Sequence, residues 1–234
     1  MSAPIPPVLR AEAVVAEGRL YGVTLSIEAG TFTLLTGDAG SGAGTLLRIL
    51  GLLERPGAGE VWLDGRATSG LDEIMWLDAR NRAFGYLFAE PFLLESFSVA
   101  ENVGLPLFKI ADMNLEQARA RATEVLGFAG LGAMAEAPVA DLTPAECHRL
   151  ALARALAIRP RALIAEAAGL HLPANELESF AALLRDVAHT LGTPVIATSG
   201  AGARTLGADC EVRLERGVIV SEPAAAQEEA PTHE

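Results

Sequence analysis

The residues with the clearest chemical pattern form a glycine-rich run, Gly37-Asp-Ala-Gly-Ser-Gly-Ala-Gly-Thr45, which contains Gly40 and Gly42. It has the outline of a phosphate-binding loop, G-x-x-x-x-G-K-[ST], whose backbone N–H groups bind phosphates and whose lysine neutralises the terminal ones. Here Ala43 stands at the lysine position and Gly44 at the position of the magnesium-binding hydroxyl, with Thr45 next. Lys109 is the only lysine in the chain, so no local shift of register can supply one. The pattern predicts a phosphate-shaped loop without its usual charge and metal ligand.

The segments on either side of this loop fit its expected structural context. Residues 31–36 form a short apolar run rich in β-forming residues, and residues 45–53 are typical of a buried helix. Strand, glycine loop and helix is the order that a phosphate loop requires. The same sequence also fits a plain strand–helix turn without a ligand, or a loop that binds nucleotide weakly through its backbone.

Further along the chain, strands alternate with helical stretches. Residues 83–88, 162–165 and 195–198 are predicted strands, and residues 211–220 a closing hairpin turned at Arg216-Gly217. Apolar residues repeat at helical spacing between positions 177 and 191 and within positions 92–158. The fold class predicted is α/β, with a largely helical insertion.

Composition excludes several classes of function. Half of the residues are apolar and the net charge is −12, which disfavours nucleic-acid binding. No apolar run approaches the length of about 18–20 residues that a membrane span needs. The first nine residues do not resemble a signal peptide, and Cys147 and Cys210 are expected to be plain reduced thiols, so we expect a cytoplasmic location.

The order of these segments resembles the ATP-binding cassette (ABC) transporter family, in particular its lipoprotein-release, lipid-trafficking and macrolide-export branch. Residues 85–88 and 99–103 are similar to the family's glutamine-loop region, and residues 150–156 to the helix after its signature. The resemblance implies a P-loop NTPase-like core with a mixed sheet, formed by residues 1–91 and 159–221. It also implies a helical signature subdomain at residues 92–158, followed by an acidic disordered tail at residues 222–234.

The functional positions that the resemblance assigns carry different side chains from those of the family. The family's glutamine corresponds to Ala89, its signature to Leu142-Thr143-Pro144-Ala145-Glu146, its magnesium-side aspartate to Glu166, its catalytic glutamate to Ala167, its loop aspartate to Pro173 and its switch histidine to Ser199. Pro144 has no N–H to offer an anion, yet Thr143 and Glu146 form the pattern of a helix capping box. Glu166 is expected to be paired locally, His148 to be exposed, and Trp76 to be a packing residue or part of a contact patch.

These substitutions favour a catalytically inactive subunit, a pseudo-ATPase that is not an enzyme and has no cofactor, with ATP and Mg²⁺ disfavoured. The resemblance implies an integral-membrane permease partner on the cytosolic face of the inner membrane, a second cassette, and lipid or lipoprotein cargo. Nucleic acid is excluded as a partner. Two alternatives stay open: an ATP-binding, weakly hydrolysing subunit that works with an intact partner cassette, and a soluble dimeric scaffold. The segment expected to dock on the permease contains Phe92, Leu93, Leu94, Val99, Glu101 and Asn102.

Overall fold

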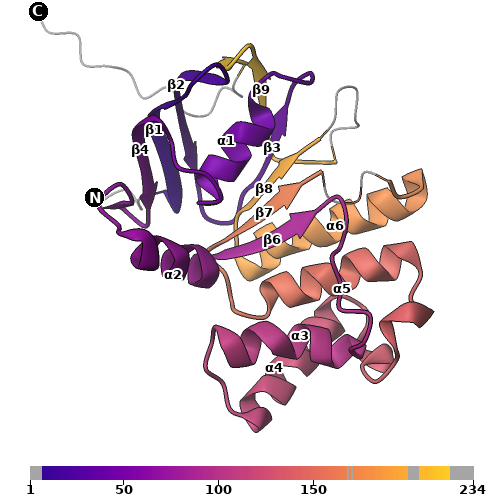
Figure 1. Ribbon diagram of the computed structural model, residues 1–234. Coiled ribbons are helices and arrows are strands. Elements are labelled where there is room, and N and C mark those ends of the chain that lie inside the picture. Colours follow the sequence, from indigo (N-terminus) through magenta and orange to yellow (C-terminus); the bar gives the residue numbers. More distant parts are fainter. Residues whose placement is uncertain (1–6, 168, 170, 200–205, 222–234) are drawn as a thin grey trace, which may run out of the picture.

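The protein contains two β-sheets with helices around them (Figure 1). The computed structural model describes residues 7–167, 169, 171–199 and 206–221, so the predicted tail at residues 222–234 lies outside the described residues. The four-stranded sheet is antiparallel in the order β2-β1-β4-β5, and the six-stranded sheet has the order β10-β9-β3-β8-β7-β6. The strands are β1 (Leu9–Ala16), β2 (Leu20–Ile27), β3 (Phe32–Thr36), β4 (Ala58–Leu63), β5 (Arg66–Ala67), β6 (Phe84–Phe88), β7 (Ala162–Glu166), β8 (Val195–Thr198), β9 (Cys210–Glu215) and β10 (Val218–Ser221).

The larger sheet is parallel except for its edge strand β10, which pairs antiparallel with β9 in the closing hairpin. Parallel strands are usually covered by helices on both faces and therefore read as continuous apolar runs, as β3 and β7 do here. Because β3, β6, β7 and β8 run in one direction, their carboxyl ends meet at one edge. In open α/β sheets this edge is where ligands bind.

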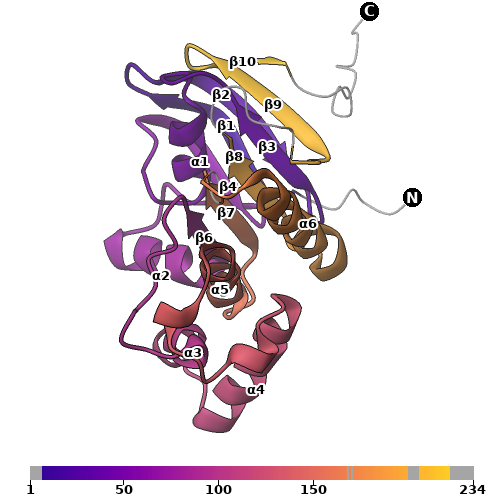
Figure 2. The ribbon, with the colours of Figure 1, turned by 90° about the vertical axis from the view of Figure 1, so that its right-hand side faces the viewer.

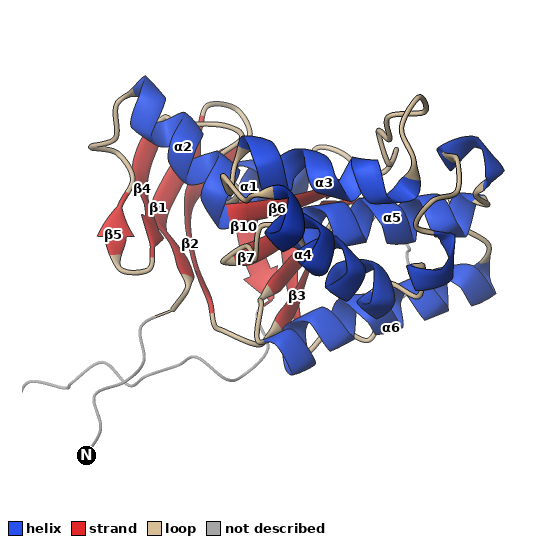
Figure 3. Ribbon diagram, turned by 90° about the horizontal axis from the view of Figure 1, so that it is seen from below, coloured by secondary structure: helices blue, strands red, loops and turns tan. Residues whose placement is uncertain are grey.

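The helices cover both faces of the larger sheet (Figure 3). They are α1 (Ala43–Leu50), α2 (Glu73–Ala83), α3 (Val99–Lys109), α4 (Leu115–Phe128), α5 (Pro144–Leu156) and α6 (Ala174–Leu191), with short 3₁₀ turns η1 (Gly132–Met134) and η2 (Val139–Asp141). Neighbouring strand residues point to opposite faces, so Leu34 packs with α5 and α6 while Leu35 packs with α1. Two hydrophobic clusters result, one on each face of the sheet.

Helix α1 lies between the two sheets, whereas α3, α4 and α5 pack against one another beyond the edge strand β6 (Figures 1 and 2). This grouping agrees with the helical insertion that the sequence predicts. The exact division at residues 92 and 158 stays a prediction. Among the described residues, no helix combines the length and apolar character needed to cross a bilayer.

The sequence predicted the fold class, and the structure confirms it. The predicted strand at residues 83–88 is β6, and the predicted closing hairpin is β9–β10. The antiparallel strands β1 and β2 and helix α2 were not located from the sequence. Within α2, Trp76 is buried and its indole N–H donates to the carbonyl of Leu52 at 3.0 Å, which confirms a packing role.

Candidate nucleotide-binding site

The glycine-rich loop has the backbone shape of a phosphate cradle. Gly37, Gly40 and Gly42 have φ values of 153°, 84° and 98°, the region that glycine adopts without strain. A Cβ on Gly42 would lie 2.7 Å from the carbonyl oxygen of Arg19, so no larger residue fits there. Gly42 caps α1, whose first N–H groups have no partner within the helix. The predicted strand–loop–helix arrangement is therefore present.

The loop borders an open cavity of about 480 Å³ at the carboxyl edge of the sheet. Every residue from Gly37 to Thr45 lines it, including Ala43 and Gly44. The strand ends contribute Glu166 and Ala167 after β7, and Thr198 and Ser199 after β8. The volume lies within the usual range of small-molecule sites, roughly 300–1,000 Å³. The structure thus brings these predicted site residues to one place.

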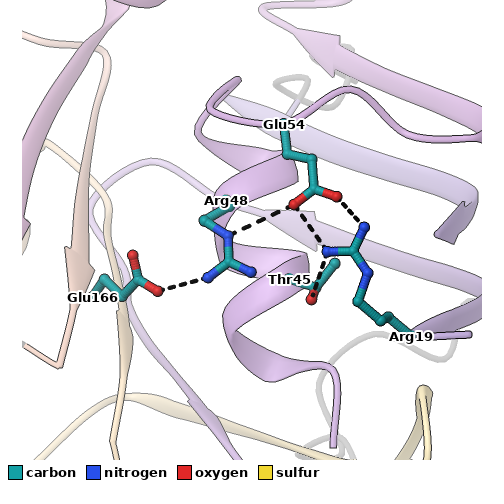
Figure 4. A network of polar contacts seen from close by, with 5 residues as sticks. All are labelled: Arg19, Thr45, Arg48, Glu54 and Glu166. Atoms are coloured by element: carbon teal, nitrogen blue, oxygen red, sulfur yellow. Dashed lines mark hydrogen bonds and ion pairs between the residues drawn. The ribbon is translucent and has the colours of Figure 1, made fainter. Parts of the chain in front are cut away.

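Two arginines line the same cavity, and both are paired with carboxylates (Figure 4). Nη1 of Arg48 donates to Oε1 of Glu166 at 2.8 Å, and its Nε lies 3.7 Å from Oε2 of Glu54. Arg19 donates from both terminal nitrogens to Glu54, and its Nη1 lies 3.5 Å from Oγ1 of Thr45. The hydrogen bond from Arg19 holds the pKa of Glu54 below its ordinary value. Glu54 therefore stays ionised at neutral pH and orients both guanidinium groups.

The ends of β7 and β8 complete the wall of the cavity. The local partner predicted for Glu166 is confirmed, since it is Arg48. The amide of Ala167 donates to Oγ1 of Thr198 at 3.1 Å, which joins the two strand ends. Oγ of Ser199 is buried and has no hydrogen-bond partner among the residues that the structure describes. A hydroxyl in this state at a cavity wall is suited to a polar ligand atom.

A divalent cation does not fit the side chains present. Mg²⁺ needs near-octahedral oxygen ligands at about 2.0–2.1 Å. Gly44 and Ala89 bear no oxygen in their side chains, and the carboxylate of Glu166 is bonded to a guanidinium. In the described part of the chain, no three His, Cys, Asp or Glu side chains gather closely enough to hold a metal.

The predicted residues of the signature region and the glutamine loop lie outside this cavity. The capping box at the start of α5 is confirmed, with the Glu146 amide donating to Oγ1 of Thr143 at 3.3 Å and a Glu146 oxygen accepting from the amide of Thr143. Pro144 and Ala145 open the helix, so the helix start is well formed. Pro173 is the N-cap residue of α6 and likewise does not line the cavity.

The prediction that His148 is exposed is wrong. Its side chain is buried on α5, with Nδ1 at 2.9 Å from the carbonyl oxygen of Pro144 and Nε2 at 3.2 Å from that of Ala89. Both ring nitrogens contact backbone carbonyls, which belong to two separate segments. The sequence around His148 could not reveal these contacts. His148 therefore ties the loop after β6 to the signature helix.

The segment expected to dock on a membrane partner is only partly accessible. Phe92 is 68% exposed and Leu94 is 38% exposed, while Leu93 packs partly against the core. Val99 and Asn102 are fully buried, so a partner cannot reach them in this conformation. Glu101 accepts from the amide of Ser98 at 2.7 Å in the capping box of α3. For Val99 and Asn102 the structure corrects the prediction, because their side chains are buried in α3 and its contacts, whereas Glu101 is exposed and its docking role stays a prediction.

Comparison with known proteins identifies the family. Residues 20–167, more than half of the chain, match the ABC transporter family. The chain belongs to this family. An ABC relative, the lipoprotein-releasing system ATP-binding protein LolD of Bordetella avium, is 35% identical over 198 residues, which cover 85% of this chain and 86% of the relative.

Solved ABC structures agree with this assignment. A dimeric ATP-binding cassette in a post-hydrolysis state, bound to ADP and Pi, is 28% identical and has a TM-score of 0.78, with 92% of this chain and 97% of that chain covered. The protein cbiO1 of Clostridium perfringens, part of the ABC transporter complex cbiONQ, has a TM-score of 0.85 at 20% identity, covering 93% of this chain and 88% of that chain. The second likeness concerns the fold alone.

The prediction that the chain is not an enzyme is contradicted by these ABC relatives. They match it over most of its length, are named as ATP-binding proteins, and include a cassette captured after hydrolysis. They point to an ATP-hydrolysing enzyme. The expectation of no cofactor is likewise not supported, since the solved relative in the post-hydrolysis state is bound to ADP and Pi.

Arg19, Arg48 and Glu54 are the residues of the site that the sequence did not reveal. Arg48 had a local signal, since it follows Gly44 by four residues and residues so spaced share a helix face. Arg19 and Glu54 had none. Arg19 reaches the cavity from the turn between β1 and β2, and Glu54 follows the end of α1 and pairs with Arg19 there, so only the packing of the two sheets around α1 brings them together.

Proposed function

We propose that this chain is an ATP-binding, weakly hydrolysing subunit of an ABC transporter that works with an intact partner cassette. The observation that carries the proposal is the cavity at the glycine loop. It combines a phosphate-shaped backbone with Arg19 and Arg48, so a polyphosphate would meet N–H donors from the backbone and from two guanidinium groups. A catalytically inactive subunit is the weaker interpretation, because the family relatives point to hydrolysis.

Slow turnover follows from the side chains at the strand ends. Ala167 cannot accept a proton, and loss of a general base typically costs about 10²–10⁴ in rate. Pro144 cannot donate a backbone N–H to a phosphate at the start of α5. The cassette that is 28% identical is dimeric. If each site of a mixed dimer takes its loop from one cassette and its signature from the other, an intact partner would bring a base to one site, but that site would face Pro144 of this chain, so hydrolysis would stay weak.

The membrane partner is proposed to occupy the groove between β6 and the helices α3 and α5. This groove has a volume of about 410 Å³ and is lined by Phe88, Leu105 and Ile110, among others. Phe92, Phe108 and Leu105 are 68%, 45% and 38% exposed beside it. Apolar patches of this kind mark interaction sites. The subunit would then sit on the cytosolic face of the inner membrane, with residues 92–158 acting as the helical subdomain that contacts the permease.

Lipoprotein or lipid cargo is the proposed transport substrate. Support comes from the Bordetella avium relative, which is named for lipoprotein release and covers most of this chain. The third reading, a soluble dimeric scaffold, leaves the exposed apolar residues at the groove without a role.

The test measures ATP hydrolysis by the chain reconstituted with its permease and partner cassette. We expect a low rate from the chain alone and a higher rate from the complete assembly. Phe92→Asp should abolish binding to the permease, whereas Tyr21→Asp, at a residue 58% exposed on β2, should not. Absence of ATP binding by the purified chain would refute the proposed nucleotide site. Unchanged binding of the Phe92→Asp variant to the permease would refute the proposed docking groove.

A further inference from the structure

The space next to Gly44 is occupied by a salt bridge. A Cβ placed on Gly44 would lie 3.6 Å from Nη1 of Arg48 and 3.7 Å from Oε1 of Glu166. These two atoms are themselves 2.8 Å apart. The missing side chain of Gly44 therefore leaves room beside the loop, and the guanidinium of Arg48 and the carboxylate of Glu166 meet there.

This salt bridge is incompatible with a divalent cation at the same place. A cation would have to displace Arg48 from Glu166 and would then find no side-chain oxygen at Gly44. It would also lie beside a permanent positive charge, because a guanidinium stays protonated at all accessible pH values. Both effects disfavour binding of Mg²⁺ in this position.

The guanidinium of Arg48 can itself perform part of the task of a cation. It has five N–H donors in a planar fork that matches phosphate oxygens. Nη1 and Nε face Glu166 and Glu54, and no described residue bonds Nη2. The side chain is 36% exposed and lines the cavity, so the remaining donors are accessible to a ligand.

Arg19 adds a second positive charge on the opposite side of Glu54 (Figure 4). Its side chain is 47% exposed and lines the same cavity. The two carboxylates fix the two guanidinium groups in place before a ligand arrives. Prior orientation of this kind lowers the entropic cost of binding.

We propose that this site binds the phosphates of a nucleoside di- or triphosphate without a divalent cation, the guanidinium of Arg48 taking the cation's place beside Glu166. The inference rests on the proposed function for ATP binding and goes beyond it in naming how the phosphate charge is neutralised. Glu166 is then a positioning residue for Arg48 and not a metal ligand.

The test is calorimetric titration of the purified full-length chain with ATP in excess EDTA and, separately, in excess Mg²⁺. We expect affinity in EDTA equal to or higher than in Mg²⁺. Binding at least tenfold tighter in Mg²⁺ would overturn this inference while leaving the proposed function standing. No binding in either buffer would overturn both.

Variants assign the effect to Arg48. Arg48→Ala should weaken ATP binding in EDTA by about ten- to a hundred-fold, as loss of a charge-assisted hydrogen bond predicts. Arg48→Lys, which keeps the charge, should lose less and guards against a folding defect. Arg10→Ala is the matched control, since Arg10 is a 45% exposed arginine on β1 that pairs with Glu12.

A double variant reverses the chemistry. G44S/R48A replaces the guanidinium by a hydroxyl at the position where the family binds its metal and frees the carboxylate of Glu166. Its ATP affinity should become dependent on Mg²⁺. A double variant with affinity equal in both buffers, together with an unaffected Arg48→Ala variant, would refute a role for Arg48 in place of the cation.

Discussion

Asn102 provides a sharp test of how the segment before α3 is held. Its side chain is fully buried. Oδ1 accepts from the amide of Leu94 at 2.9 Å, and Nδ2 donates to the carbonyls of Leu94 and Ser98 at 3.1 Å and 3.0 Å. One side chain thus satisfies three backbone groups of the loop that presents Phe92 and Leu94.

The variant Asn102→Ala removes all three bonds and leaves the amide of Leu94 unpaired, while the carbonyls of Leu94 and Ser98 each keep one backbone donor, the amides of Phe97 and Asn102. Each lost bond costs roughly 1 kcal/mol, so the free energy of unfolding should fall by about 3 kcal/mol. For a chain of this size that corresponds to a decrease in Tm of about 6–12 °C. Urea unfolding followed by circular dichroism measures the free energy of unfolding. Hydrogen exchange should show lost protection of the backbone amides at residues 94–98.

The matched control is Asn81→Ala, at an exposed asparagine within α2. Its effect should stay within about 0.5 kcal/mol. The reasoning is refuted if Asn102→Ala costs less than about 1 kcal/mol and leaves exchange in the loop unchanged. That result would mean that the buried amide does not order the loop.

Three further perturbations test other contacts. Thr143→Ala removes the N-cap of α5 and should lower the free energy of unfolding by about 1 kcal/mol, while Thr143→Ser should not; equal losses in urea titrations would contradict the capping role. His148→Phe keeps a ring but removes both carbonyl contacts, so we expect a loss of about 1–3 kcal/mol and faster hydrogen exchange around Ala89; unchanged exchange there would rule out the link. Hydrogen bonds from Arg19 depress the pKa of Glu54 in the folded state, so its contribution to stability is present above the unfolded pKa of about 4.3 and is lost as pH falls through the lower folded value. Glu54→Gln should flatten this acid dependence in urea titrations between about pH 5 and pH 3, and an unaltered profile would count against it.

Most of the fold could be predicted from the sequence because its signals are local. The strand β3, the glycine loop and α1 follow one another directly, and the capping box of α5 is spelled out by Thr143 and Glu146. Strands β1 and β2 were not located because their residues alternate between buried and exposed with interruptions. The register between them shifts between Ala11 and Val14 and again after Val14, which breaks the periodicity of two.

The backbone shape of the site could be predicted from the sequence, but the charged side chains that line it could not. Gly37, Gly40 and Gly42 define the loop within a few residues, so the pattern alone indicated its shape. The guanidinium groups at the cavity belong to Arg19 and Arg48, and Glu54, which lies 35 residues after Arg19, pairs with Arg19 only in the folded chain. A search for lysine at one position could not detect a guanidinium that arrives from another element. The conclusion that the chain is not an enzyme is overturned by its ABC relatives and not by these contacts.

Separate packing of the two faces of the large sheet has a mechanical consequence. Helix α1 is enclosed by both sheets, while α3, α4 and α5 belong to the cluster on the other face. A tilt of α3, α4 and α5 would change the side-chain contacts of their own cluster. The contacts of α1, which position the glycine loop, would stay as they are. Because His148 on α5 contacts the carbonyl of Ala89 after β6, a tilt of α5 would reach this edge of the sheet first.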